Sequence, residues 1–344
     1  MFRLKSLIIV INIIILIFAI ELFFIFILNF KTEVGMNTCK RIYNKEKDFS
    51  SYSPNCKSVI KHWEQSNFVT YETNSAGRRD LDSENSDIKK IAFIGDSFTF
   101  GAMVPIEDNY NFFAFSNILK KSYNIHNYGT PAEQLHNVFN KLKTINQKDY
   151  EYIIYGLTPN DFFDLVDGKF NPKKISTSKI ETFEAEGYNT NLINKIKSYL
   201  VSSATSRFIL HTLMSNDQIY LKTYISRKPY SEYLSKNLSS SWEESLNYFE
   251  ELLKNLGINY KSKFKIFILP QRAEIVSIRL NNYNSTLSNK IIEICNKNKI
   301  DCYSPNLIPL SKIEESHFPV DGHLTKEGNK VLAKELAKWA RDWD

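Results

Sequence analysis

The stretch KIAFIGDSFTFG, residues 90–101, contains a short apolar run that enters a Gly-Asp-Ser turn. Residues 91–94 are apolar without interruption, which is typical of a strand buried on both faces of a parallel sheet. The turn places Ser97 just beyond the carboxyl end of that strand. A serine there is either a polar residue that ends a strand or a nucleophile with an exposed hydroxyl, and the motif alone does not distinguish the two.

Predicted strands and helices alternate through the rest of the chain. Further strands are predicted at 123–128, 150–155, 264–269 and 301–303, and helices at 109–121, 132–146, 242–256, 283–298 and after an N-cap at Thr325. This alternation predicts a parallel sheet with helices on both faces. Ligands of such sheets bind at the carboxyl ends of the strands, so functional residues are expected just after Ile94, Tyr128, Tyr155 and Leu269. A helical insertion is expected at about 165–240, because a coil of that length is uncommon.

The N-terminus carries a long apolar segment. Residues 7–30 are apolar apart from Asn12, Glu21 and Asn29. A helix needs roughly 20 apolar residues to cross a bilayer, whereas the apolar region of a signal peptide has roughly 7–15. No small-x-small cleavage site follows. Residues 1–31 are therefore predicted to remain as a transmembrane anchor.

The charges near this segment predict its orientation. Arg3 and Lys5 favour a cytoplasmic N-terminus, which places the rest of the chain in the periplasm or outside the cell. Glu21 is costly at that depth, so it is either a protonated or snorkelling carboxylate or a contact for a partner helix. Residues 32–88 are polar, with turn signals at 53–55 and 74–77, and are expected to form an extracytoplasmic tether and lead-in. A domain at 89–344 follows.

Charge and cysteine content limit the classes of partner. The chain has 44 Lys and Arg against 38 Asp and Glu, and the resulting charge of +6 is scattered, so no nucleic-acid partner is expected. Cys39 and Cys56 lie close together in the sequence, as do Cys295 and Cys302. Two local disulfides suit an exported chain, but the spacing leaves their pairing open. No Cys/His spacing typical of metal ligands occurs, so no metal site is expected.

Polar groups at the other strand ends complete a candidate site. Gly129 can offer an unobstructed backbone N–H, and Asn160 can offer a side-chain amide. Asp321 and His323 stand at the entrance to the last helix, where an imidazole can act as general base while a carboxylate fixes its tautomer. With Ser97, these segments supply one nucleophile, two donors and one base.

In these residues the chain resembles the SGNH (GDSL) hydrolases. The matching residues are Gly95-Asp96-Ser97 with Phe98-Thr99-Phe100-Gly101, Gly129, Asn160-Asp161, and Asp321 with His323, spread over residues 90–342. The resemblance implies a flavodoxin-like three-layer α/β/α fold. It also implies Ser97 as nucleophile, His323 as base and Asp321 as its partner. The oxyanion hole would then consist of the Ser97 and Gly129 N–H groups and the Asn160 amide.

The chain departs from the family pattern at two places. Only Gly322 separates Asp321 from His323, where members commonly have two residues, although some branches share the shorter form. Thr158 stands where members favour glycine, and Gly156 lies two positions earlier. The first departure bears on the role of Asp321, and the second shifts the turn that carries Asn160.

The N-terminal anchor and the stretch at 74–78 are similar to those of membrane-anchored bacterial members, which act on esters, often acyl groups on cell-surface glycans. The resemblance therefore implies an exported serine esterase with no cofactor and with an acylated small molecule or glycan as substrate. One alternative is an O-acyltransferase that modifies an exported polysaccharide together with a membrane partner protein. The other is a non-catalytic envelope-binding protein on the same fold.

The remaining polar residues near the motifs have structural interpretations. Asp96 is expected to support its turn through hydrogen bonds, and Asp161 to start a helix or turn. Arg272 follows a strand end, where it could meet an anionic or sugar substrate, but a surface arginine is the simpler expectation. His317 is the only rival base, and His126, His136 and His211 are expected to be surface or helix residues.

Overall fold

A five-stranded parallel sheet lies at the centre of the protein, which is described here from a computed structural model. Residues 2–28, 30–80, 88–120, 123–170 and 203–343 are described. The sheet strands are β6 (Lys90–Gly95), β7 (Asn124–Asn127), β8 (Tyr152–Leu157), β9 (Phe264–Ile268) and β10 (Asp301–Tyr303). Their order across the sheet is β10-β9-β8-β6-β7, and every pair is parallel. In chain order this is 2-1-3-4-5, the flavodoxin-like arrangement, so the expected fold class is confirmed.

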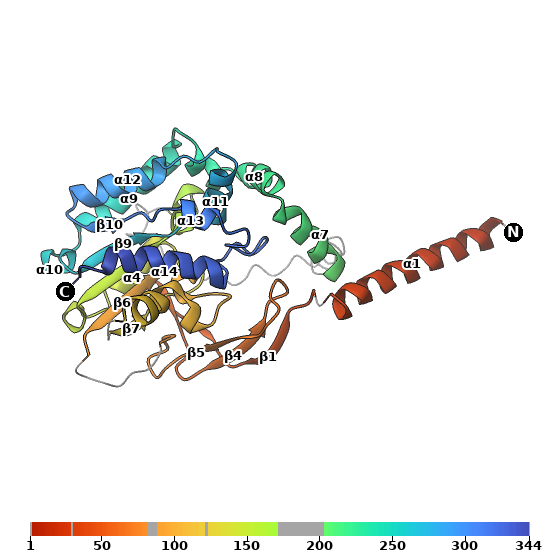
Figure 1. Ribbon diagram of the computed structural model, residues 1–344, viewed down its shortest axis with the longest axis horizontal. Helices are drawn as coiled ribbons and strands as arrows, with labels where there is room; N and C mark the ends of the chain where they lie inside the picture. Colours follow the sequence, from red (N-terminus) through yellow and green to blue (C-terminus); the bar gives the residue numbers. More distant parts are fainter. Residues whose placement is uncertain (1, 29, 81–87, 121–122, 171–202, 344) are drawn as a thin grey trace.

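Helices cover both faces of the sheet (Figure 1). One face packs against α4 (Leu135–Leu142), α9 (Ser240–Lys254) and α12 (Thr286–Lys297), and the other against α3 (Tyr110–Phe112), α11 (Arg272–Arg279) and α14 (Lys326–Ala340). Side chains of β6 alternate between the two layers. Ala92 and Ile94 join the first core, and Ile91 and Phe93 join the second, each with no exposed surface. This two-sided burial is why the strand is apolar at every position.

The predicted elements are present, with ends displaced by a few residues. The helix expected at 109–121 is α3 followed by the π-helical segment η2 (Phe113–Leu119). Thr325 caps α14 as expected, because its hydroxyl accepts the Gly328 N–H. The short helices, which sequence periodicity does not detect, are α2 (Ser97–Phe100), η1 (Ile106–Asp108), η3 (Gln147–Asp149), η4 (Pro159–Phe162), α5 (Phe163–Val166), η6 (Tyr230–Leu234), α10 (Ile258–Lys261) and α13 (Ile308–Ser311).

The segment expected as a tether and lead-in forms two small antiparallel sheets. One contains β1 (Glu33–Asn37), β4 (Lys57–Lys61) and β5 (Val69–Glu72), and the other contains β2 (Arg41–Asn44) and β3 (Phe49–Tyr52). The sequence prediction placed no strand here, because these strands are short and half exposed. Their stability comes from cross-strand pairing and from the domain beneath them.

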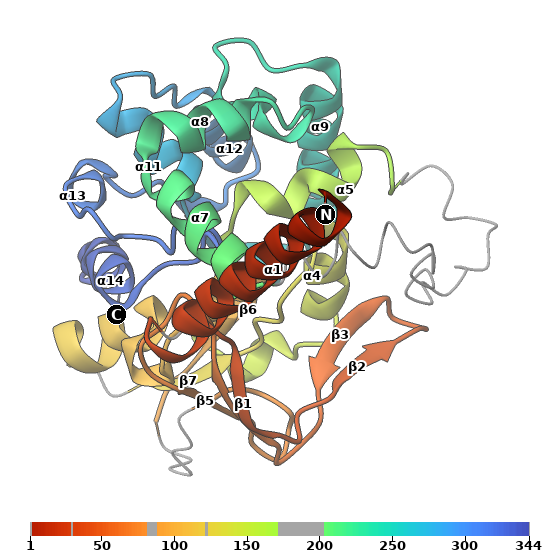
Figure 2. The same cartoon turned by 90° about the vertical axis from the view of Figure 1, so that its right-hand side faces the viewer.

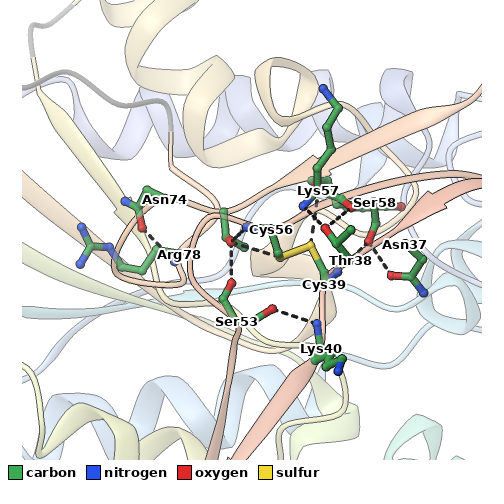
Figure 3. Close-up of a disulfide and its surroundings, with 12 residues drawn as sticks. Asn37, Thr38, Cys39, Lys40, Ser53, Cys56, Lys57, Ser58, Asn74 and Arg78 are labelled. Atoms are coloured by element: carbon green, nitrogen blue, oxygen red, sulfur yellow. Dashed lines mark hydrogen bonds between the residues drawn. A yellow bond between two sulfur atoms is a disulfide. The ribbon is translucent and has the colours of Figure 1, made fainter.

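Both pairs of neighbouring cysteines form disulfides. Cys39 and Cys56 join the chain just after β1 to the chain just before β4, as Figure 3 shows. Around this bond Lys40 N–H donates to the Ser53 hydroxyl, and Arg78 N–H donates to Asn74 Oδ1. Cys295 and Cys302 join α12 to β10. These contacts settle the pairing that the spacing left open.

Arg79 connects the lead-in to the turn that carries Ser97. Its side chain is buried, with 2% of the residue exposed. The guanidinium donates to the carbonyl oxygens of Phe100 (3.0 Å), Gly101 (2.5 Å) and Val104 (2.7 Å). Next to it, Asp80 Oδ1 accepts the Asn127 N–H at the end of β7. The lead-in is therefore part of the structure that supports the strand ends.

The insertion is helical in its described part. Helices α7 (Ala204–Ser215) and α8 (Asp217–Ile225) follow one another, and residues 171–202 of the expected insertion lie outside the described residues. The N-terminal helix α1 (Phe2–Phe26) projects from one end of the body, and α7 lies against its base in both views (Figures 1 and 2). The segment Ile9–Phe26 is long and apolar enough to cross a membrane or to act as a signal sequence.

We expect Arg79→Met to lower the free energy of unfolding by at least about 2 kcal/mol, because it leaves several buried carbonyl oxygens without a donor. Chemical denaturation of the full chain in a mild detergent measures this loss. Arg78→Met is the matched control, since the Arg78 side chain is 20% exposed and pairs with Asp80. An equal loss in both variants would contradict the structural role of Arg79.

Candidate active site

The turn after β6 brings Ser97 to the carboxyl edge of the sheet. Asp96 is the N-cap of α2, and its Oδ1 accepts the Phe98 N–H at 2.9 Å. Gly95 has a φ of +155°, and a Cβ at this position would lie 2.4 Å from Thr99 Oγ1 and 2.8 Å from the Gly156 carbonyl oxygen. Only glycine fits between these atoms. The composition of the turn thus follows from the close approach of α2 to the strand ends.

Asp96 also ties this turn to the end of β8. Its Oδ2 accepts hydrogen bonds from Asn160 Nδ2 at 2.8 Å and from the Thr158 hydroxyl at 3.2 Å. Asp96 has no exposed surface, and this burial raises the pKa of its carboxyl although the donors around it act in the opposite direction. The expected supporting role of Asp96 is confirmed. The Asp96 side chain thus ties Asn160 to the turn that carries Ser97.

His323 and Asp321 meet Ser97 at this edge. The His323 Nε2 lies 2.7 Å from Ser97 Oγ, and His323 Nδ1 is in a short contact with Asp321 Oδ1. Asp321 Oδ1 also accepts the His323 N–H at 3.2 Å, which makes a tight Asx turn. Gly322 between them has a φ of +85°. The one-residue spacing therefore still allows the carboxylate to face its imidazole.

The electrostatics of the pair suit a general base. Burial lowers the pKa of His323, but the hydrogen bond and negative charge of Asp321 outweigh this effect and leave the pKa above its ordinary value of 6.5. Burial raises the pKa of Asp321, but the hydrogen bond and charge of His323 outweigh it and leave that pKa below 3.8. Asp321 is thus ionised, and its charge stabilises the imidazolium that forms when His323 takes a proton.

Two of the expected oxyanion donors already have acceptors within the chain. The Gly129 N–H donates to Asn127 Oδ1 at 2.9 Å, and Asn160 Nδ2 donates to Asp96. Gly129 packs so tightly on α2 that a Cβ would lie 2.3 Å from the Phe100 nitrogen. An oxyanion at Ser97 would share the Gly129 N–H with Asn127, whereas Asn160 has a second N–H on the same nitrogen.

Gln271 orients Asn160, and sequence analysis did not identify it. Its Nε2 donates to Asn160 Oδ1 at 2.8 Å, which turns the Asn160 amide nitrogen toward Asp96. The Gln271 Oε1 in turn accepts the hydroxyls of Tyr224 (2.9 Å) and Tyr233 (3.2 Å). Gln271 lies just past β9, where functional groups were expected, so its position at a strand end was the available signal.

Glu64 holds the loop that carries Asp321, and nothing in the local sequence pattern marks it. Its two carboxylate oxygens accept the N–H groups of Val320 and Asp321, each at 2.8 Å. The side chain has no exposed surface. Burial raises the pKa of Glu64 to about 7. His62, from the same segment, lies 3.9 Å from Glu64 through its Nδ1 and interacts electrostatically with Asp321.

Arg272 is buried, so the expectation of a surface arginine is wrong. Only 6% of the residue is exposed, and the guanidinium lies 3.9 Å from the ring centre of Tyr220. Arg272 donates to the Pro319 carbonyl oxygen and, at 2.6 Å, to the Met214 carbonyl oxygen. It therefore joins the insertion to the loop before Asp321.

The remaining candidates lie apart from the reacting atoms. His317 is 3% exposed and its Nδ1 lies 3.0 Å from the Ser316 hydroxyl, while burial lowers its pKa to about 3. His317 is thus neutral, and its Nδ1 contacts the Ser316 hydroxyl instead of Ser97. Asp161 is the third residue of η4 and supports the start of this helix, where its Oδ2 accepts the N-cap Thr158 N–H, as expected. His126 contacts Tyr150, His136 stacks on Phe170, and His211 lies in α7.

No group of three or more His, Cys, Asp or Glu side chains in the described ranges could hold a metal ion. Known protein families provided no matching model, and no curated protein matched.

A search of solved structures found matches of low similarity. A member of the lipolytic protein G-D-S-L family from Veillonella parvula is 12% identical, with a TM-score of 0.38, over 74% of this chain and 99% of that one. LAE5, an alpha/beta hydrolase enzyme from the metagenome of Lake Arreo, is 9% identical, with a TM-score of 0.34, over 74% of this chain and 96% of that one. Similarity this low carries no argument about what the chain does.

Glu64→Gln is expected to make stability less dependent on pH. Between the ordinary pKa of 4.5 and about 7, the folded chain keeps a proton on Glu64 that the unfolded chain has lost. The free energy of unfolding contributed by Glu64 therefore falls as pH rises through this window. Thermal unfolding at pH 5 and pH 8 measures this. The melting temperature of the variant, relative to that of the wild type, should be higher at pH 8 than at pH 5. The exposed Glu314→Gln serves as control, and parallel behaviour of the two variants would contradict the argument.

Proposed function

We propose that this protein is a serine esterase whose nucleophile is Ser97. The observation that carries the proposal is the chain of contacts from Ser97 Oγ through His323 to Asp321, with 2.7 Å between Oγ and Nε2. These groups come from the turn after β6 and from the loop before α14, which are 226 residues apart. A nucleophile, a base and an ionised carboxylate in line are what acyl transfer to a serine requires.

The proposed reaction uses only groups of this chain. His323 Nε2 takes the Ser97 hydroxyl proton while Oγ attacks the ester carbonyl carbon, which gives a tetrahedral intermediate. The N–H groups of Ser97 and Gly129 and the Asn160 amide would stabilise its oxyanion. His323 then gives the proton to the departing alcohol oxygen, which leaves an acyl-enzyme. Water, deprotonated by His323, attacks this ester and releases the acid and free Ser97.

Hydrolysis is preferred here to transfer of the acyl group to a sugar. The sequence argument for a membrane partner that supplies acyl groups to a transferase was Glu21. The Glu21 carboxylate accepts hydrogen bonds from Ala204 and Thr205 of the same chain. These hydrogen bonds account for a carboxylate in the apolar helix without a second protein.

The apolar helix α1 supports the proposed location and, with it, the class of substrate. Helix α1 would hold the chain in a membrane, and Arg3 and Lys5 would keep its N-terminus in the cytoplasm. The domain then lies outside the cytoplasm, where two disulfides are stable. We propose an acyl ester of the cell envelope or of a linked glycan as the substrate.

A fluorophosphonate probe should label the full chain in detergent. Ser97→Ala and His323→Ala should abolish labelling, since the first removes the nucleophile and the second its base. Ser215→Ala, on the exposed surface of α7, should label as the wild type does. Gel fluorescence with circular dichroism as a folding check measures this. Labelling that survives in a folded Ser97→Ala variant would exclude Ser97.

The rate of labelling should depend on the ionisation of His323. The base is active when neutral, and its pKa lies above 6.5, so the rate should fall as pH falls through a value above 6.5. Asp321→Asn should lower the maximal rate on the order of 10³–10⁴-fold and move the acid limb to lower pH, because the charge that raises the pKa is gone. Pseudo-first-order rates between pH 5 and pH 9 provide the profile. An unchanged limb in Asp321→Asn would contradict the assignment.

A further inference from the structure

Helix α7 begins beside the part of α1 that is apolar enough to cross a membrane. Glu21 lies in that segment, five residues before the end of α1, which corresponds to about 7.5 Å along the helix axis. The Glu21 Oε1 accepts the Ala204 N–H at 2.6 Å, and Oε2 accepts the Thr205 N–H at 3.0 Å. The first turn of α7 is therefore bound to α1 at Glu21, about one and a half helical turns before the residue at which α1 ends.

The beginning of α7 has the hydrogen bonds that a helix end in lipid requires. Besides the two N–H groups bound by Glu21, the Ser206 N–H donates to Ser203 Oγ and the Arg207 N–H to the Ser203 carbonyl oxygen. The first four N–H groups of a helix lack partners within the helix, and lipid offers none. In α7 the N–H groups of Ala204, Thr205 and Ser206 are bound by Glu21 and Ser203, and the Arg207 N–H makes the first hydrogen bond of the helix itself.

Aromatic rings fix α7 against the base of α1. The Phe208 ring stacks on Phe24 with 4.6 Å between ring centres, and Phe30 contacts both Phe208 (5.5 Å) and His211 (5.8 Å). Trp63 of the lead-in lies 6.0 Å from Phe30. Of these residues, Trp63 is of the type that favours the boundary between lipid and water. Figure 2 shows α7 beside α1 when the molecule is viewed toward this end.

The exposed side of α7 contains two apolar residues beside the polar Thr212. Ile209 and Leu213 are four residues apart, on one face of the helix, and are 52% and 42% exposed. At the far end of α7, the Met214 carbonyl oxygen accepts from Arg272, which also holds Pro319 in the loop before Asp321. A continuous path of contacts therefore connects the apolar helix α1 to the loop that carries His323.

We propose that α7 is an interfacial helix, which lies at the membrane boundary beside α1 with Ile209 and Leu213 in contact with lipid. Lipid is the proposed occupant, because α7 is hydrogen-bonded to α1 through Glu21 and α1 is itself exposed along its apolar length. Through Glu21 and Arg272, α7 holds the candidate active site against the membrane surface. This proposal does not depend on the reaction that the site performs.

Fluorescence quenching by lipid tests the proposal on the full chain. The four cysteines form two disulfides, so a cysteine introduced at position 209 can be labelled alone with a thiol-reactive bimane. The chain is placed in phosphatidylcholine nanodiscs with or without a nitroxide on the upper acyl chain. The apolar face of an interfacial helix lies about 5–10 Å into the boundary, within reach of that nitroxide. We expect Ile209→Cys to lose fluorescence.

Two matched positions calibrate the measurement. Ile308→Cys on α13, 50% exposed, should keep its fluorescence, and Ile27→Cys at the end of α1, 68% exposed, should lose it. Adding Glu21→Ala to Ile209→Cys should remove most of the loss at position 209, because the cap that holds α7 to α1 is gone. Glu21→Gln, which keeps one acceptor oxygen, should be intermediate.

Quenching at position 27 without quenching at position 209 would overturn the proposal, and would leave a protein partner as the occupant of this face. Absence of quenching at position 27 would overturn it as well, because α7 is held to α1. If position 209 stays quenched after Glu21→Ala, the part of the proposal in which Glu21 holds α7 beside α1 is overturned.

Discussion

The close packing of α2 against the strand ends is the constraint on which the candidate site depends. Three glycines make it feasible, since a Cβ at Gly95, Gly129 or Gly156 would lie within 2.4 Å of an atom of Thr99 or Phe100. The Thr99 carbonyl oxygen then accepts side-chain amides from Asn109, Asn111 and Asn127. Because the helix lies directly on three strands, Ser97 at its start is held over the point where the strand order reverses.

The contact of His323 with Ser97 depends on support from outside the sheet. The loop around Asp321 is bound by Glu64 from the lead-in and, through Pro319, by Arg272 of α11. Neither residue contacts Ser97, yet both bind the backbone of the loop that positions His323. The lead-in and the insertion are thus parts of one site with the sheet, and rigid support of this kind is what keeps a catalytic hydrogen bond within reach.

Glu21 shows how one interaction can join the apolar helix α1 to a folded domain. Its two oxygens bind the first N–H groups of α7, where the helix dipole favours a negative charge. A flexible tether would leave the domain free to rotate, whereas this cap and the packing of Phe208 on Phe24 restrict it. The proposed interfacial position of α7 follows from that restriction and from the exposed Ile209 and Leu213.

Local pattern was sufficient for the sheet, its helices and the groups at its edge. The apolar run before Ser97, the cap at Thr325 and the Asp321-Gly322-His323 stretch are all short-range features, because strand burial, helix capping and an Asx turn depend on neighbours in the chain. The strand order, the disulfide pairing and the proximity of Ser97 to His323 needed the tertiary structure. Glu64, Gln271 and Arg272 acquire their roles only there, since their partners lie 47 to 257 residues away. The type of a buried polar residue does not specify which distant backbone group it will bind. Only folding of the whole chain decides that.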